Sequence, residues 1–158
     1  MISKLYKYIF YFLAFLGVLM LAIGTAQVVS RYVLHNSLTW SEETMRFLNV
    51  WTIYIGVSVG IPLGIHVSID AIPNMLKGKT KNILSLIILI LSLIFYLIFL
   101  VQGVRFSLAN LNQYAPATMV PMGYVYLCLP LGGLLAALFT VDEILKLSKR
   151  MGEDKCQQ

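Results

Sequence analysis

Four long apolar runs constrain the fold of this chain more than any other feature of its sequence. They cover residues 9–29, 47–61, 83–104 and 122–141. A helix crosses the hydrocarbon core of a bilayer with about 20 apolar residues, and three of the runs reach or approach that length. The second run reaches it if its helix begins near Thr39. Only 12% of the residues are charged and 59% are hydrophobic, which excludes the surface of a soluble globule.

We therefore predict an all-α integral membrane protein with four transmembrane helices, in a single membrane domain over residues 1–158. The four spans are expected at about residues 8–30, 39–61, 82–105 and 122–147. A cleaved signal peptide is an alternative for the first run, with Lys4 and Lys7 as its basic region. The run of about 21 apolar residues exceeds the roughly 7 to 15 of a signal peptide, which favours a retained span.

Lysine and arginine are distributed unevenly among the segments that connect these runs. Nine of the twelve lie before the first span, between the second and third spans, or after the fourth. The other three are Arg31, Arg46 and Arg105. Because basic residues concentrate on the cytoplasmic side of a membrane, we predict that both termini and the middle connection are cytoplasmic.

The connection between the second and third spans has the pattern of a short amphipathic helix on the membrane surface. After Pro62, apolar residues recur at spacings of four, three and four, opposite polar residues that include His66 and Asp70. Pro73 is expected to break this helix. An ordinary cytoplasmic loop is the alternative. In either case, His66 and Asp70 are expected to be structural caps or contacts to the cytoplasmic surface of a partner.

The second span begins with a charged segment whose side chains can cap the helix and pair with one another. Thr39-Trp40-Ser41-Glu42 fits the capping box, in which Thr39 and Glu42 satisfy each other's backbone N–H groups. Glu42 is also spaced to pair with Arg46 one turn later. A charge at a helix centre costs about 2.5 to 3.5 kcal/mol, so we expect Glu42 and Glu43 near the membrane surface. Capping and pairing, contact with a partner, and ion coupling are all open as their role.

The same helix has two chemically different faces. At roughly 100° per residue its aromatic side chains cluster within about 60°, while Gly56 and Gly60 lie nearly opposite. Glycines at this spacing permit close helix packing, as do Gly132 and Ala136 in the last span, where Pro130 predicts a kink. An interfacial aromatic belt explains the first tryptophan but not the deeper aromatic residues. We therefore predict a partner interface made of Trp40, Glu42, Glu43, Arg46, Phe47, Trp51 and Tyr54.

The sequence carries no residue pattern of an enzyme or of a cofactor site. His35 and His66 fall on opposite sides of the membrane by the charge count, so they cannot form a haem pair. Cys128 and Cys156 form no C-x-x-C motif. The other three apolar runs hold no carboxylate, whereas transport needs polar groups or broken helices at the midplane. We expect no catalytic, metal or substrate-binding residue, no cofactor and no nucleic-acid partner.

Several motifs occur in an order that matches a known family. They are residues 31–34 with 37–43, Trp51, Gly56, the glycine–histidine motif at 64–70, and Leu129-Pro130-Leu131-Gly132. Over roughly residues 9–147 the chain resembles the small, Q-type membrane subunit of tripartite ATP-independent periplasmic (TRAP) transporters.

This resemblance implies a bacterial or archaeal cytoplasmic membrane and a large multi-span subunit that carries the solute and sodium sites by an elevator-type motion. It also implies a periplasmic substrate-binding protein that delivers organic acid anions such as C4-dicarboxylates or sialic acids. The chain itself would be a non-catalytic scaffold. Two other classes remain open, an autonomous small four-helix exporter and a membrane anchor subunit of an electron-transfer enzyme. The exporter would need a carboxylate in its first span, which is absent here.

Overall fold

The computed structural model describes residues 2–36, 38–62 and 79–156. In these ranges the chain forms helices and no strand, apart from one isolated antiparallel bridge between Tyr114 and Pro121. The all-α class is therefore confirmed. The helices are α1 Ile2–Tyr32, α2 Thr39–Gly60, α4 Lys79–Ala109, the short α5 Met122–Tyr126, and α6 Cys128–Cys156.

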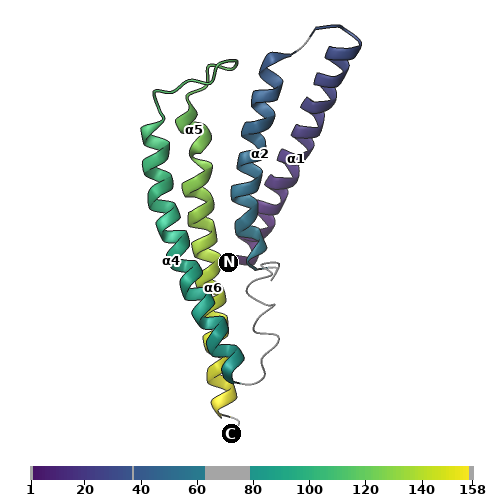
Figure 1. Ribbon diagram of the computed structural model, residues 1–158. Helices are drawn as coiled ribbons and strands as arrows, with labels where there is room; N and C mark the ends of the chain where they lie inside the picture. The colour runs from purple at the N-terminus through teal and green to yellow at the C-terminus, as the bar shows by residue number, and fades with distance from the viewer. Residues whose placement is uncertain (1, 37, 63–78, 157–158) are drawn as a thin grey trace.

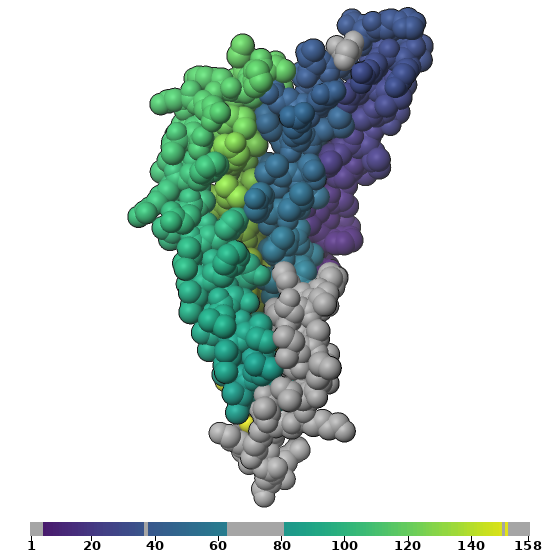
Figure 2. All heavy atoms as spheres, viewed as in Figure 1, coloured from purple at the N-terminus to yellow at the C-terminus, as the bar shows by residue number. Residues whose placement is uncertain are grey.

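The helices form two antiparallel pairs that meet along one seam (Figure 1). α1 packs on α2, α4 packs on α6, and α2 packs on α6, so α2 and α6 are the inner helices. The space-filling view shows the surface of α6 between α2 and α4 (Figure 2). The α1–α2 turn and the α4–α5 loop lie at the same end, which we call the loop end (residues 33–36 and 110–121). The first residues of α1 and the last residues of α6 lie away from the loop end, and α4 and α6 extend further from it than α1 and α2 do.

Three helical segments are long and apolar enough to cross a membrane, namely Leu5–Tyr32, Lys81–Ala109 and Met122–Lys149. The expected count of four is wrong by this measure, because α2 does not qualify within the part of the chain that the structure describes. The reason is chemical: α2 carries Glu42, Glu43 and Arg46 inside the length that a span needs. α2 nevertheless lies alongside both α1 and α6.

The start of α2 is where the sequence placed it, but the cap is different. The helix begins at Thr39 with Leu38 as N-cap, and no side chain caps it, so the predicted capping box is wrong. The buried Ser41 makes a different local contact: its Oγ donates to the Leu38 carbonyl at 2.7 Å, which leaves the free N–H groups of the first turn without a side-chain cap.

The last span is interrupted near Pro130. The expected single helix at 122–147 is two helices, α5 and α6, which are separated by Leu127. Pro130 is the third residue of α6, where its missing N–H costs little because the first turn has no intrahelical acceptors to lose.

The tightest helix contact joins the backbones of α2 and α6. A Cβ atom placed on Gly132 would lie 2.5 Å from the Tyr54 carbonyl oxygen, and one on Gly133 would lie 3.2 Å from the Leu100 nitrogen of α4. Gly56 is different, because the nearest atom to its Cβ would be Leu13 Cδ1 at 4.0 Å. The close approach of α2 to α6 therefore depends on Gly132 and not on Gly56, since a small residue lets helices gain van der Waals contact that lipid cannot supply.

On the side of this contact away from the loop end, side chains from all four long helices form one buried cluster. It includes Ile9 of α1, Val59 of α2, Tyr96 of α4, and Ala136 and Phe139 of α6. Phe139 is 1% exposed, the largest fully buried side chain among the residues described. The proposed surface helix between α2 and α4, with His66 and Asp70, lies outside the described residues.

The glycine contact predicts a difference between two otherwise similar substitutions. Gly132→Ala must push α2 away from α6 at a backbone carbonyl, and we expect a loss of about 1–3 kcal/mol in unfolding free energy, as for overpacked cores. Gly17→Ala is the matched control, since nothing lies within 4 Å of a Cβ at that position of α1. Thermal unfolding of the purified chain in mild detergent measures both. Equal midpoints for the two variants would contradict the tight α2–α6 contact.

Candidate functional site

The charged residues at the start of α2 lie at the loop end and contact two different parts of the chain. Glu43 Oε2 accepts hydrogen bonds from the backbone N–H groups of Ala117, at 3.2 Å, and Thr118, at 2.7 Å. These groups belong to the α4–α5 loop, 74 and 75 positions further along the sequence. Because the acceptor is a carboxylate oxygen, both are charge-assisted hydrogen bonds, the stronger kind. Glu43 therefore fastens the loop to α2.

The loop is shaped to present those two N–H groups. The Ala115 N–H donates to the Val120 carbonyl and the Met119 N–H to the Ala115 carbonyl, both at 3.0 Å. Met119 adopts a left-handed backbone with φ 53°, which a non-glycine residue does at some cost. Ala115 is 1% exposed, so the loop is anchored by a buried residue beside its tight turn.

Glu42 contacts α1 and not its own helix. Its Oε1 accepts a hydrogen bond from Gln27 Nε2 at 3.2 Å. The ion pair expected between Glu42 and Arg46 is not formed, and Arg46 is exposed without a hydrogen bond or ion pair to any residue the structure describes. An exposed pair of this kind is worth only a few tenths of a kcal/mol, so a competing amide partner is enough to displace it.

The aromatic face of α2 is divided between internal packing and the surface. The Tyr54 ring stacks on Phe99 of α4 with a centroid distance of 5.7 Å, and Trp51 packs against the buried cluster. Trp40 is 45% exposed, and Phe47 is half-buried. The sequence showed no signal for Phe99 or Thr118 as neighbours of this face, because both are distant in the chain.

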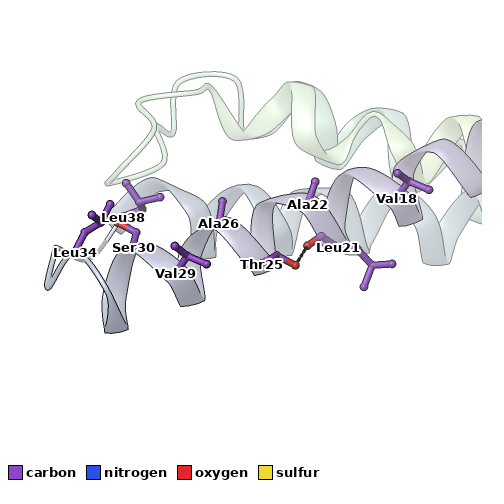
Figure 3. Close-up of a pocket in the computed structure, with 9 residues that line it drawn as sticks. All are labelled: Val18, Leu21, Ala22, Thr25, Ala26, Val29, Ser30, Leu34 and Leu38. Carbon is purple, nitrogen blue, oxygen red and sulfur yellow. Dashed lines mark hydrogen bonds between the residues drawn. The ribbon is translucent and has the colours of Figure 1, made fainter.

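An apolar groove follows the half of α1 nearest the loop end (Figure 3). Its walls include Val18, Ala22 and Ala26, and the turn residues Leu34 and Leu38 close one end. Its hydroxyl groups are already used: Thr25 Oγ1 donates to the Leu21 carbonyl at 2.8 Å, and Ser30 Oγ donates to the Asn36 carbonyl. The groove can therefore take an apolar surface, but it has no free hydroxyl group for a polar solute.

Most of the apolar surface of the outer helices is not covered by the chain itself. Only 11% of the span in α1 and 6% of the span in α4 are buried, against 44% in the span that contains α6. Within the described residues, no group of three histidine, cysteine, aspartate or glutamate side chains is placed to hold a metal ion. The outer helices therefore offer apolar surface to lipid or to another membrane helix.

The Glu43 contact predicts where the protein loosens when the carboxylate is removed. Glu43→Ala should increase amide hydrogen exchange at Ala117 and Thr118 by about tenfold or more, because a hydrogen bond to a charged group contributes about 1.5–3 kcal/mol. Glu42→Ala is the control, since it removes a single contact to Gln27 and none to the loop. Exchange mass spectrometry of peptides covering 110–121 is the measurement. Equal exchange in Glu43→Ala and the unaltered protein would show that the carboxylate does not hold the loop.

Two comparisons place this architecture among known proteins. The family model described as "Tripartite ATP-independent periplasmic transporters, DctQ component" matches residues 20–150. A Haemophilus influenzae protein described as a TRAP transporter small permease protein is 28% identical over 120 residues, which cover 75% of this chain and 73% of that protein. The family consists of transporter components and not of enzymes. The chain therefore belongs to the DctQ family of TRAP transporter small membrane subunits and is a multi-pass protein of the bacterial inner membrane.

Proposed function

We propose that this chain is the non-catalytic small subunit of a sodium-coupled TRAP transporter and packs as scaffold against the large membrane subunit. The transporter takes up an organic acid anion of the C4-dicarboxylate or sialic acid type from a periplasmic binding protein. The observation that carries the proposal is the apolar surface of α1 and α4 that the chain itself leaves uncovered.

The groove on α1 supports this helix as the side that meets the large subunit. Its small residues Ala22 and Ala26 are exposed and one turn apart, a spacing that lets a second helix approach closely. The exposed face of α4 differs, since it consists of bulky residues such as Ile87, Leu91 and Ile94, which suit lipid tails. Trp40 and Arg46 are exposed at the loop end and are further proposed contacts.

The two glutamates of α2 are assigned a structural role in this proposal. Glu42 accepts from Gln27 and Glu43 from the α4–α5 loop, so both carboxylates already hold parts of the chain together. Coupling to sodium would then belong to the large subunit. Both termini are cytoplasmic in this arrangement, because Lys81, Lys146 and Lys149 lie at the end opposite the loops.

Orientation can be tested with single cysteines at the two ends. In a background with Cys128→Ala and Cys156→Ala, a membrane-impermeant maleimide should label Asn36→Cys in intact cells, because the turn would face the periplasm. Lys149→Cys, which is also at an exposed position, should react only after the membrane is permeabilised. The reverse pattern would place the termini outside the cytoplasm and remove this part of the proposal.

Partner packing can be tested by co-expression with the neighbouring genes and purification in mild detergent. We expect a large multi-span protein to co-purify in stoichiometric amount with the unaltered chain. Ala22→Trp, which fills the α1 groove, should lower its recovery about tenfold, equivalent to about 1.4 kcal/mol. Ile94→Trp on the exposed face of α4 should not.

Two results would count against this assignment. If the unaltered chain is recovered alone while the large protein is present but unbound, the scaffold role is wrong. If Ile94→Trp and not Ala22→Trp prevents recovery, the scaffold role stands and the contact face is α4.

A further inference from the structure

A second groove opens between α2, α4 and α6 and differs from the α1 groove in carrying a charge. It has a volume of about 590 Å³, and its walls are mainly aromatic and aliphatic. The residues that shape it are Tyr54, Phe99, Gln102, Arg105, Phe106 and Leu129.

The floor and both ends of this groove are formed by direct helix contacts. At Gly103 the helices α4 and α6 touch, because a Cβ there would lie 2.9 Å from the Pro130 nitrogen. The stacked rings of Tyr54 and Phe99 stand at the inner end. Phe106 of α4 packs on Tyr126 of α5, with centroids 4.8 Å apart, at the end nearest the loop. The groove therefore belongs to a well-packed part of the chain.

Arg105 supplies the only cationic group lining the groove, and nothing the structure describes neutralises it. Its guanidinium forms no ion pair or hydrogen bond with any described residue. Arg105 lies four residues before the end of the apolar segment Lys81–Ala109, or about 6 Å at 1.5 Å per residue. The segment has 29 residues and is longer than the roughly 30 Å of a hydrocarbon core, which would put Arg105 near the boundary between hydrocarbon and headgroups, where an arginine extends its charge toward the interface.

We propose that this groove binds a glycerophospholipid, with the phosphate on Arg105 and one acyl chain along Phe99 and Leu129. The guanidinium presents N–H donors in a planar fork that matches phosphate oxygens, and Gln102, one turn deeper, can donate to the ester carbonyls. The aromatic and aliphatic walls suit an acyl chain. Phospholipid is the occupant with both an anionic group and an apolar chain at this depth. The proposal does not depend on the large subunit.

Arg46 offers a matched control for Arg105. The contact between Tyr54 and Phe99 gives a common reference point on α2 and α4. Arg46 lies eight residues from Tyr54 toward the loop end, or about 12 Å along the helix. Arg105 lies six residues from Phe99 in the same direction, or about 9 Å. The two arginines therefore lie at similar distances from the loop end, and so at similar depths in a membrane. Only Arg105 lines the groove, and both are exposed and unpaired among the residues described.

The test is lipid titration of the full-length chain, delipidated in mild detergent and followed by native mass spectrometry. Dioleoyl phosphatidylglycerol should form a one-to-one adduct that survives collisional activation. Arg105→Gln should weaken it about tenfold, as expected for loss of a charge-assisted contact, and Arg46→Gln should change it less than about twofold. Dioleoylglycerol, which lacks the phosphate, should bind as weakly as the phospholipid binds to Arg105→Gln. Matched unfolding midpoints confirm that both variants are folded.

Several outcomes would overturn the proposal. Equal losses in the two arginine variants would mean that the charge acts non-specifically, and no loss in Arg105→Gln would remove the phosphate contact. Binding of inorganic phosphate as tightly as the phospholipid would show that the groove holds a free anion and that the acyl chain contributes nothing. A photoreactive benzoyl-phenylalanine at Ala109, which lines the groove, should add the mass of a phospholipid in cells. A cross-link to a protein at that position would mean that a membrane helix occupies the groove.

Discussion

The arrangement of the whole chain depends on the contact of Gly132 with the Tyr54 backbone. It is the point where the α1–α2 pair touches the α4–α6 pair at backbone distance, and a single methyl group there would lie 2.5 Å from a carbonyl oxygen. Because Tyr54 is held so close to α6, its ring reaches α4 and stacks on Phe99. This contact thus links the packing of the inner helices to the inner end of the groove that carries Arg105.

The helices were predictable from the sequence, and the contacts between them only in part. Helix length and the start at Thr39 follow from the apolar runs, which act locally. The number of membrane-crossing helices was overestimated, because an apolar run at 47–61 was extended back over Glu42, Glu43 and Arg46. The GxxxG-like spacing of Gly56 and Gly60 indicated close packing on α2, yet the closest approach found is at Gly132, since spacing does not reveal which neighbouring backbone lies opposite.

The contacts of the two glutamates show even more clearly that spacing in the sequence does not reveal distant partners. Sequence reasoning paired Glu42 with its near neighbours Thr39 and Arg46, because only local spacing is visible in a sequence. The structure gives both glutamates distant partners, Gln27 on another helix and backbone amides 74 and 75 residues away. Long-range contacts to backbone groups leave no mark in the sequence, since any residue except proline supplies an N–H.

Because the glutamates have these partners, the acidic and basic groups at the loop end have different roles. Glu42 and Glu43 are engaged within the chain, whereas Arg31, Arg46 and Arg105 are exposed and form no ion pair among the residues described. The acidic groups therefore hold helices and loop together, and the basic groups are left to meet the surroundings. At the headgroup level of a bilayer those surroundings hold lipid phosphate as well as water, so an exposed guanidinium group there is available to an anionic lipid or to a partner. The scaffold role that we propose would use this division, because the internal polar contacts hold helices and loop together while the outward charges and apolar faces remain available for binding.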